Sequence, residues 1–285
     1  MQALYDVPAP AKLNLFLHIT GRRADGYHLL QSVFMLVDWA DTLYFERRSD
    51  GLISREDLTW ALPPEDLTVR AAHALRAATG CAAGVHIGVH KSVPAQAGMG
   101  GGSSDAASTL LALNHLWGLR LPLPQLEKIG LALGADVPFF LRGRNAWVEG
   151  IGEKITPLDH ALQLPKARFA VVKPAAGLDT KSIFSHSDLK RDSDSATISG
   201  FAAAHLDFGR NDLQPVAQAM CPEVSQALCW LDSRGLKGRM TGSGSAVFAR
   251  MQHAADLSGA PVGWQVRSCE NLLTHPLAGW ASDTV

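Results

Sequence analysis

A run of glycines constrains the fold of this chain more than any other feature. Four of the five residues from Gly98 to Gly102 are glycine, and two hydroxyl side chains, Ser103 and Ser104, follow at once. Glycine adopts backbone conformations closed to other residues and allows a ligand to approach the main chain closely. A segment of this kind is typical of a tight turn between regular elements.

The residues on either side of the glycines show the periodicities of a strand and a helix. Residues 84–93 alternate as in a β-strand, whereas apolar residues recur at helical spacing from Ala106 to Trp117, and Gly118 supplies a stop. A helix that begins at the glycines presents unpaired N–H groups and the positive end of its dipole, which attract an anion. The pattern predicts a phosphate-binding loop, with a purely structural turn as the alternative.

Two common phosphate loops do not fit this segment. A Walker A loop needs a lysine after its last glycine, and Ser103 stands there instead. A dinucleotide-binding loop needs Gly-x-Gly-x-x-Gly, with an acidic residue about twenty positions later. Its third glycine is again replaced by Ser103, and residues 121–124 are apolar or proline.

Composition and charge narrow the class of protein. The chain has 285 residues, 47% of them hydrophobic, which is enough for one large domain or two modest ones. A net charge of -1 argues against a nucleic-acid-binding surface. No stretch is long enough to cross a membrane, no signal pattern stands at the N-terminus, and four scattered cysteines indicate reduced thiols. We therefore expect a cytoplasmic protein with no nucleic acid, no membrane and no obligate protein as partner.

Strand-like and helical patterns alternate along the chain, which predicts a mixed α+β fold. Residues 185–200 are dense in Ser, Asp and Lys and are predicted to form an exposed loop. Strands are expected at residues 11–19, 29–39 and 168–173, and helices at residues 67–78, 125–133, 213–220 and 223–233.

Three motifs resemble those of the galactokinase, homoserine kinase, mevalonate kinase and phosphomevalonate kinase (GHMP kinase) superfamily. Residues 94–104 match Pro-x-x-x-Gly-Leu-Gly-Gly/Ser-Gly-Ser-Ser, with Met99 in the leucine position; the other two motifs lie at residues 10–19 and 241–248. Within the superfamily, the Ala-Lys-Leu-Asn-Leu opening, Arg-x-Asp-Gly-Tyr-His at residues 23–28 and residues 133–140 resemble the 4-diphosphocytidyl-2-C-methyl-D-erythritol kinase family. This resemblance extends over nearly the whole chain.

The resemblance implies a two-lobed GHMP kinase fold. A ribosomal-S5-like N-terminal ATP lobe at residues 1–156 and a ferredoxin-like C-terminal lobe at residues 157–285 would enclose the active cleft. The implied reaction is ATP-dependent phosphorylation of the 2-hydroxyl of 4-diphosphocytidyl-2-C-methyl-D-erythritol, in the non-mevalonate route to isoprenoid precursors. The implied cofactors are ATP and Mg²⁺, and the partner is a small-molecule substrate carrying a cytidine diphosphate group. The alternatives are a homoserine or mevalonate type of kinase, or a non-catalytic nucleotide- or RNA-binding protein with an S5-like lobe.

Two charged residues are expected to act on the acceptor hydroxyl. Asp136 follows a predicted helix end, where a carboxylate is partly desolvated; a helix-capping or surface role is the alternative. The resemblance implies that Asp136 is the catalytic base. Lys12 lies in an apolar strand pattern. An isolated lysine in such a strand usually lies at the sheet edge or faces solvent. The resemblance instead places it beside Asp136, favouring the ionised carboxylate.

The resemblance assigns ATP binding to the whole glycine-rich segment. The hydroxyl of Ser104 is predicted to bind Mg²⁺, with helix capping as the alternative. The predicted ATP-binding residues are Pro94, Ala95, Gln96, Ala97, Gly98, Met99, Gly100, Gly101, Gly102, Ser103 and Ser104.

Recognition of the acceptor is assigned to residues that suit a cytosine, which needs stacking on its face and polar groups at its edge. The resemblance implies that His28 binds the base, that Tyr27 and Phe184 stack on its two sides, and that Asn14 contacts the erythritol. The full set of predicted substrate-binding residues is Asn14, Tyr27, His28, Thr180, Phe184 and Thr241.

Two positions depart from the family pattern. Many members have asparagine near the adenine where this chain has Asp66, so that the adenine contact stays open. Asp105 also replaces an asparagine, in the predicted first turn of the helix after the glycines.

Overall fold

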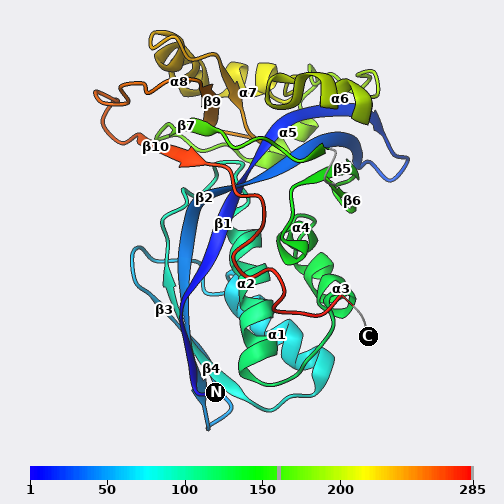
Figure 1. Ribbon diagram of the computed structural model, residues 1–285, viewed down its shortest axis with the longest axis vertical. Helices are drawn as coiled ribbons and strands as arrows, with labels where there is room; N and C mark the ends of the chain where they lie inside the picture. Colours follow the sequence, from blue (N-terminus) through cyan, green and yellow to red (C-terminus); the bar gives the residue numbers. More distant parts are fainter. Residues whose placement is uncertain (159–161, 284–285) are drawn as a thin grey trace.

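The computed structural model describes residues 1–158 and 162–283. Helices and strands alternate along the chain, as Figure 1 shows. The strands are β1 (Ala3–Arg22), β2 (His28–Arg48), β3 (Ile53–Asp57), β4 (Gly84–His90), β5 (Ala146–Gly150), β6 (Lys154–Pro157), β7 (Arg168–Lys173), β8 (Gly238–Met240), β9 (Val247–Met251) and β10 (Gln265–Glu270). The helices are α1 (Leu67–Thr79), α2 (Gly101–Leu116), α3 (Leu123–Leu133), α4 (Val137–Arg142), α5 (Thr180–Ser185), α6 (Ile198–Ala204), α7 (Gln214–Met220) and α8 (Pro222–Asp232), with a 3₁₀ turn, η2 (His205–Asp207).

The first sheet is built around a long antiparallel pair, β1 and β2. Their register runs from Ala3 opposite Glu46 to Arg22 opposite His28. The sheet order is β3-β4-β2-β5-β6, with β1 pairing on β2, and helices α1 to α4 lie on one side of it (Figure 1). Apolar side chains from α1, α2 and the sheet form one continuous core. This packing holds α2 almost entirely inside the protein, with its N-terminus at the glycines.

The second sheet is antiparallel, in the order β10-β7-β9-β8, and helices α5 to α8 lie near it (Figure 1). The end of β1 enters this half, because Leu17 and Ile19 share a core with residues of α7 and α8. The last described residues return to the first half: Leu277 packs in its core and Trp280 against it. The two sheets are therefore joined by β1 and by the C-terminal segment, and the division at residue 156 stays a prediction.

The predicted mixed α+β class is confirmed. The strands predicted at residues 11–19 and 29–39 are parts of the longer β1 and β2, whereas three other predicted segments are close to their observed bounds. Helix α1 covers residues 67–79, α3 covers 123–133 and β7 covers 168–173. The prediction of an exposed loop at residues 185–200 is partly wrong. Leu189 and Ser193 are buried there, and α6 begins at Ile198. Composition alone gave the wrong prediction, because polar contacts hold this Ser-rich segment against the rest of the protein. One of them joins Ser193 Oγ to Asp212 Oδ2 at 2.6 Å.

Candidate active site

A cleft of about 690 Å³ is lined by residues from both halves of the chain. Its walls include the segment 94–103, the start of α5 at Thr180 and the turn between β8 and β9. Lys12 and Asp136 also line it. The cleft thus gathers most of the residues that the sequence predicted to act together.

The glycine-rich segment forms the floor of the cleft at the N-terminus of α2. Gly100 precedes the helix with φ of +72° and no side-chain cap, so that the first N–H groups of α2 lack intrahelical partners. Gly101, Gly102 and Ser103 all line the cleft. Backbone donors and the helix dipole therefore converge where an anion can reach them.

The second glycine turn packs directly on this loop. Gly98 has φ of +68°, and a Cβ atom there would lie 2.2 Å from Thr241 O. A Cβ atom on Gly242 would lie 2.6 Å from Gly98 O. Glycine is required at both positions, because no side chain fits between two backbones in such close contact. The turn between β8 and β9 therefore lies in backbone contact with the glycine loop.

Lys12 and Asp136 meet across the cleft floor, with Lys12 Nζ 3.8 Å from Asp136 Oδ2. The ammonium also donates to Asn14 Oδ1 at 2.5 Å and to Gly98 O at 3.2 Å. It lies 4.5 Å from the centre of the Phe34 ring. Burial lowers the pKa of Lys12, and the attraction of Asp136 partly opposes that shift. The result is a desolvated cation beside a carboxylate, in reach of the phosphate loop.

Asp136 occupies the N-cap position of α4, but its side chain makes no capping hydrogen bond. The side chain is 30% exposed and belongs to the cleft. Helix α4 positions it, because residues Val137 to Leu141 are all buried and the helix cannot move independently. The capping alternative is therefore not what the structure shows.

Three of the predicted binding residues make hydrogen bonds within the protein. The Ser104 hydroxyl is buried and donates to Pro10 O at 2.7 Å, so that the predicted Mg²⁺ ligand points into the core and neither caps α2 nor faces the cleft. Ser103 faces the cleft instead. Asn14 Nδ2 donates to Ser32 Oγ, and Asn14 N donates to Thr241 Oγ1 at 2.9 Å. Asn14 and Thr241 therefore tie the two halves of the site together.

Of the residues predicted to bind cytosine, only Phe184 lines the cleft, and His28 lies beside it. The ring centre of Phe184 is 5.2 Å from that of His28. Tyr27 is 60% exposed on the turn between β1 and β2. Thr180 Oγ1 contacts Ser243 Oγ at 2.7 Å. The structure brings His28 and Phe184 together and leaves the Tyr27 side chain exposed, and the stacking of Tyr27 and Phe184 on a cytosine stays a prediction.

A buried charge cluster that the sequence did not predict lies beneath the glycine loop. Lys91 bridges the carboxylates of Asp41 and Asp105, and Asp41 Oδ1 accepts from the backbone N–H groups of Ser92 and Val93. Burial raises the pKa of Asp105 to about 8; the attraction of Lys91 opposes the shift and the repulsion of Asp41 adds to it. No short-range pattern signals this cluster, because its members come from β2, the end of β4 and α2.

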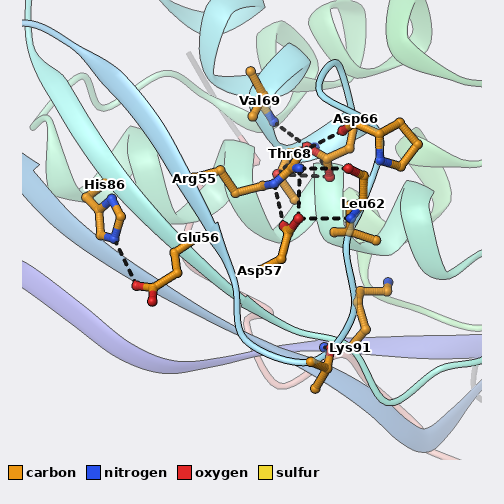
Figure 2. A network of polar contacts seen from close by, with 11 residues as sticks. Arg55, Glu56, Asp57, Leu62, Asp66, Thr68, Val69, His86 and Lys91 are labelled. Atoms are coloured by element: carbon orange, nitrogen blue, oxygen red, sulfur yellow. Dashed lines mark hydrogen bonds and ion pairs between the residues drawn. The ribbon is translucent and has the colours of Figure 1, made fainter.

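Asp66 lines the cleft and belongs to a polar network that Figure 2 shows. It precedes α1 and accepts from Thr68 N and Val69 N, while Arg55 Nη1 donates to its Oδ1 at 2.6 Å. Arg55 also binds Asp57 and the carbonyl groups of residues 62 and 63. The carboxylate that replaces the family's asparagine is therefore used as a helix cap and an ion-pair partner.

No metal cluster is preassembled in residues 1–158 and 162–283, since no group of three His, Cys, Asp or Glu side chains in that part could hold an ion. None of the helices described there is long and apolar enough to cross a membrane.

Two family models match parts of this chain. Residues 66–144 match a family model described as "GHMP kinases N terminal domain", and residues 194–260 match "GHMP kinases C terminal". A 4-diphosphocytidyl-2-C-methyl-D-erythritol kinase from Acidovorax sp. (strain JS42) is 71% identical over 280 residues, which is 98% of this chain and 99% of that protein.

Two of the similar solved structures are a kinase of the same kind and a homoserine kinase. One is the crystal structure of a 4-(cytidine 5'-diphospho)-2C-methyl-D-erythritol kinase, with a TM-score of 0.74 and 34% identity over 88% of this chain and 90% of that one. The other is a homoserine kinase from Cytophaga hutchinsonii, with a TM-score of 0.65 and 14% identity over 96% of each chain. At that identity the second likeness supports the fold alone.

Proposed function

The chain belongs to the 4-diphosphocytidyl-2-C-methyl-D-erythritol kinases of the GHMP kinase superfamily, and from this premise we propose its reaction and the roles of its residues. The enzyme transfers the γ-phosphoryl group of ATP to the 2-hydroxyl of 4-diphosphocytidyl-2-C-methyl-D-erythritol. ADP leaves, and the acceptor becomes the 2-phosphate. The single observation that carries the assignment is the pairing of Lys12 with Asp136, 3.8 Å apart, beside the N-terminus of α2.

The glycine loop binds the triphosphate. The free N–H groups at the start of α2 donate to phosphate oxygens, and each hydrogen bond to a charged group is worth roughly 1.5–3 kcal/mol. Phosphoryl transfer depends mainly on such positioning and on electrostatic stabilisation. Asp66 and Lys91 line the same cleft, and their side chains limit the space that is left for the nucleoside.

Asp136 accepts the proton of the attacking hydroxyl, and Lys12 stabilises the charge that develops on the transferred group. Asp136 suits this role because its carboxylate is free of capping bonds and faces the cleft. Lys12 is only 4% exposed, so its charge acts through a medium less screened than water.

Mg²⁺ is the expected second cofactor. This ion favours oxygen ligands and is usually held through one or two carboxylates together with substrate phosphates. The Asp136 carboxylate and the Ser103 hydroxyl both line the cleft and fit that donor set. Bound there, the ion would neutralise charge on the phosphates. We assign the protein ligands to these two residues in place of Ser104.

The cytidine diphosphate group occupies the part of the cleft beside His28 and Phe184, and Tyr27 stacks on the base from its exposed position on the hairpin. The enzyme is assigned to the cytoplasm and acts without nucleic acid, membrane or obligate protein partner. The division of the chain into lobes at residue 156 belongs to the same proposal.

A substrate panel tests the assignment. The purified chain is mixed with ATP and Mg²⁺, and ADP release is followed with the cytidyl substrate, homoserine and mevalonate in turn. ADP release only with the cytidyl substrate, with one phosphate added to it by mass spectrometry, is the expected result. Turnover of homoserine or mevalonate instead would assign the chain to a sister kinase, and ATP binding without any turnover would favour a non-catalytic protein.

A further inference from the structure

We propose that Arg191, acting through His28, sets the hydrogen-bonding character of the base-binding end of the cleft. Arg191 is a positioning residue that holds His28 in the neutral tautomer with its proton on Nδ1. That tautomer offers a donor to a base ring with an acceptor edge, as in cytosine. The inference rests on the proposed function for its substrate, but the tautomer itself is a property of the free enzyme.

The geometry of one hydrogen bond fixes the tautomer. Arg191 Nε lies 3.0 Å from His28 Nε2. Arginine carries only donors and stays charged, so His28 Nε2 must be the acceptor and cannot carry a proton. The neutral ring then has its proton on Nδ1, and the doubly protonated ring is excluded because both of its nitrogens would be donors. Burial, Arg191 and Arg22 together lower the pKa of His28, which also favours the neutral ring.

The guanidinium has no donor left for a ligand. Besides Nε, its two Nη groups donate to four backbone carbonyl groups, so the five N–H donors of an arginine are matched by five acceptors. These acceptors are Phe184 O at 3.2 Å, His186 O at 2.7 Å, Ser187 O at 3.4 Å and Leu189 O at 2.9 Å. Arg191 therefore shapes the pocket without contacting substrate.

The same contacts couple two distant parts of the chain. His28 is the first residue of β2, whereas Phe184 lies on α5, and Arg191 binds the ring of one and the backbone of the other. The Phe184 ring lies against the His28 ring at 5.2 Å with 35° between the planes. Removing Arg191 thus frees the imidazole to change tautomer and frees the segment that carries the aromatic ring.

The free N–H of His28 gives the site a preference between bases. In the part of the chain that the structure describes, no hydrogen-bond partner takes up Nδ1 of His28. Cytosine presents an unprotonated N3 that accepts from this donor, whereas uracil presents an N3–H that opposes it. A site whose N–H donor pairs with N3 of cytosine rejects uracil, because uracil leaves that donor unpaired.

Nitrogen-15 NMR of histidine-labelled enzyme tests the tautomer without substrate. The His28 signals are assigned from the spectrum of the His28→Gln variant. We expect a protonated Nδ1 and an unprotonated Nε2 in the wild type and in Arg22→Gln. Arg22→Gln is the matched control. Arg22 is also a nearby positive charge that lowers the pKa of His28, but its Nε donates to Gly26 O and not to the His28 ring. A wild-type His28 protonated at Nε2 would overturn the proposal.

Steady-state kinetics of Arg191→Gln give the second test. We expect the KM for the cytidyl substrate to rise about 10- to 100-fold, while the KM for ATP stays within about twofold. The preference for the cytidyl over the uridyl substrate, as a ratio of kcat/KM values, should fall about tenfold. An unchanged KM for the cytidyl substrate would overturn the proposal. If Arg191→Gln does not fold, the wild-type NMR spectrum alone decides whether His28 has the proposed tautomer. If the wild type has no kinase activity, the proposed function fails, and the spectrum still tests the tautomer.

Discussion

At the scale of single residues, the chemistry depends on two side chains that the chain brings together from positions 12 and 136. Lys12 would be unstable in an apolar strand by itself, since burying an unpaired charge is costly. It is retained because Asn14, Gly98 and Asp136 all supply oxygen atoms to its ammonium group. The sequence motifs predicted both residues, but only the fold shows what compensates the buried charge.

Replacement of Asp136 by asparagine should lower kcat about 10²- to 10⁴-fold, because the amide cannot accept the substrate proton. ATP binding, measured by calorimetry in the absence of Mg²⁺, should change little, because the glycine loop still holds the phosphates. Asp50→Asn is the matched control, since Asp50 is exposed and pairs with Arg48 away from the cleft. Near-normal turnover of Asp136→Asn would remove that residue from the mechanism.

The lowered pKa of Lys12 gives a prediction for the alkaline side of the pH profile. Only the protonated amine stabilises negative charge, so kcat should fall as the pH rises through the pKa of Lys12. Because burial lowers that pKa, the fall should come at a lower pH than an ordinary lysine would give. Rates measured from about pH 7 to 11, with circular dichroism as a check on folding, test this. A plateau that extends past the ordinary lysine value would contradict the role of Lys12.

At the scale of elements, the site depends on two glycine turns in backbone contact. The loop before α2 and the turn between β8 and β9 meet at Gly98 and Gly242. The sequence predicted the first turn from its glycines, and the second segment was recognised as a motif at residues 241–248. It could not predict the contact itself, because 143 positions separate Thr241 from Gly98 and no periodicity links them.

Two alanine substitutions distinguish the effect of losing this backbone contact from the effect of replacing a glycine that has a positive φ. Gly98 and Gly118 have similar φ values, +68° and +70°, but a Cβ atom meets Thr241 O at Gly98 and nothing within 4 Å at Gly118. Gly118→Ala should cost about 1 kcal/mol of unfolding free energy with normal kinetics. Gly98→Ala should cost about 2–4 kcal/mol and raise the KM for ATP. Equal effects of the two substitutions on stability and KM would contradict the inferred contact.

The charge cluster under the first turn of α2 predicts a pH-dependent stability. Folding raises the pKa of Asp105 to about 8 from about 4 in the unfolded chain, so the folded state holds an extra proton between these values. The contribution of Asp105 to stability therefore falls as the pH rises through this window.

Asp105→Asn removes that titration while keeping the shape of the side chain. The difference in unfolding free energy, variant minus wild type, should be about 1–3 kcal/mol larger at pH 8 than at pH 5. Urea unfolding at the two pH values measures the change. The same difference from wild type at both values would show that Asp105 does not titrate in this range.

The elements most reliably predicted from the sequence are those with long periodic patterns and clear stops. Helix α1 is an example: Asp66 caps its start and Gly80 ends it in a left-handed conformation. The short helices α4 and α5, with six residues each, were missed because six residues give too few repeats of a helical period. Yet α4 positions Asp136 and α5 carries Phe184, so tertiary packing fixes the parts of the site that local pattern cannot show.

At the scale of the whole molecule, one strand connects the two halves of the site. β1 carries Lys12 and Asn14 at the cleft floor and then enters the second core at Leu17 and Ile19. The backbone of Asn14 is tied to Thr241, and Leu17 N donates to Arg210 O at 2.8 Å. The sequence predicted a two-lobed enzyme by resemblance. It could not show that the first strand and the C-terminal segment cross between the lobes, because such crossings depend on long-range pairing.

The proposed reaction requires that the amides of residues 98–103 hold the triphosphate so that its terminal phosphate faces an alcohol beside Asp136. A crystal structure of the enzyme with a non-hydrolysable ATP analogue and the cytidyl substrate tests it most directly. We expect the terminal phosphate at the N-terminus of α2, with the 2-hydroxyl about 2.6–3.2 Å from the Asp136 carboxylate. A triphosphate bound elsewhere, or a 2-hydroxyl turned away from Asp136, would contradict it.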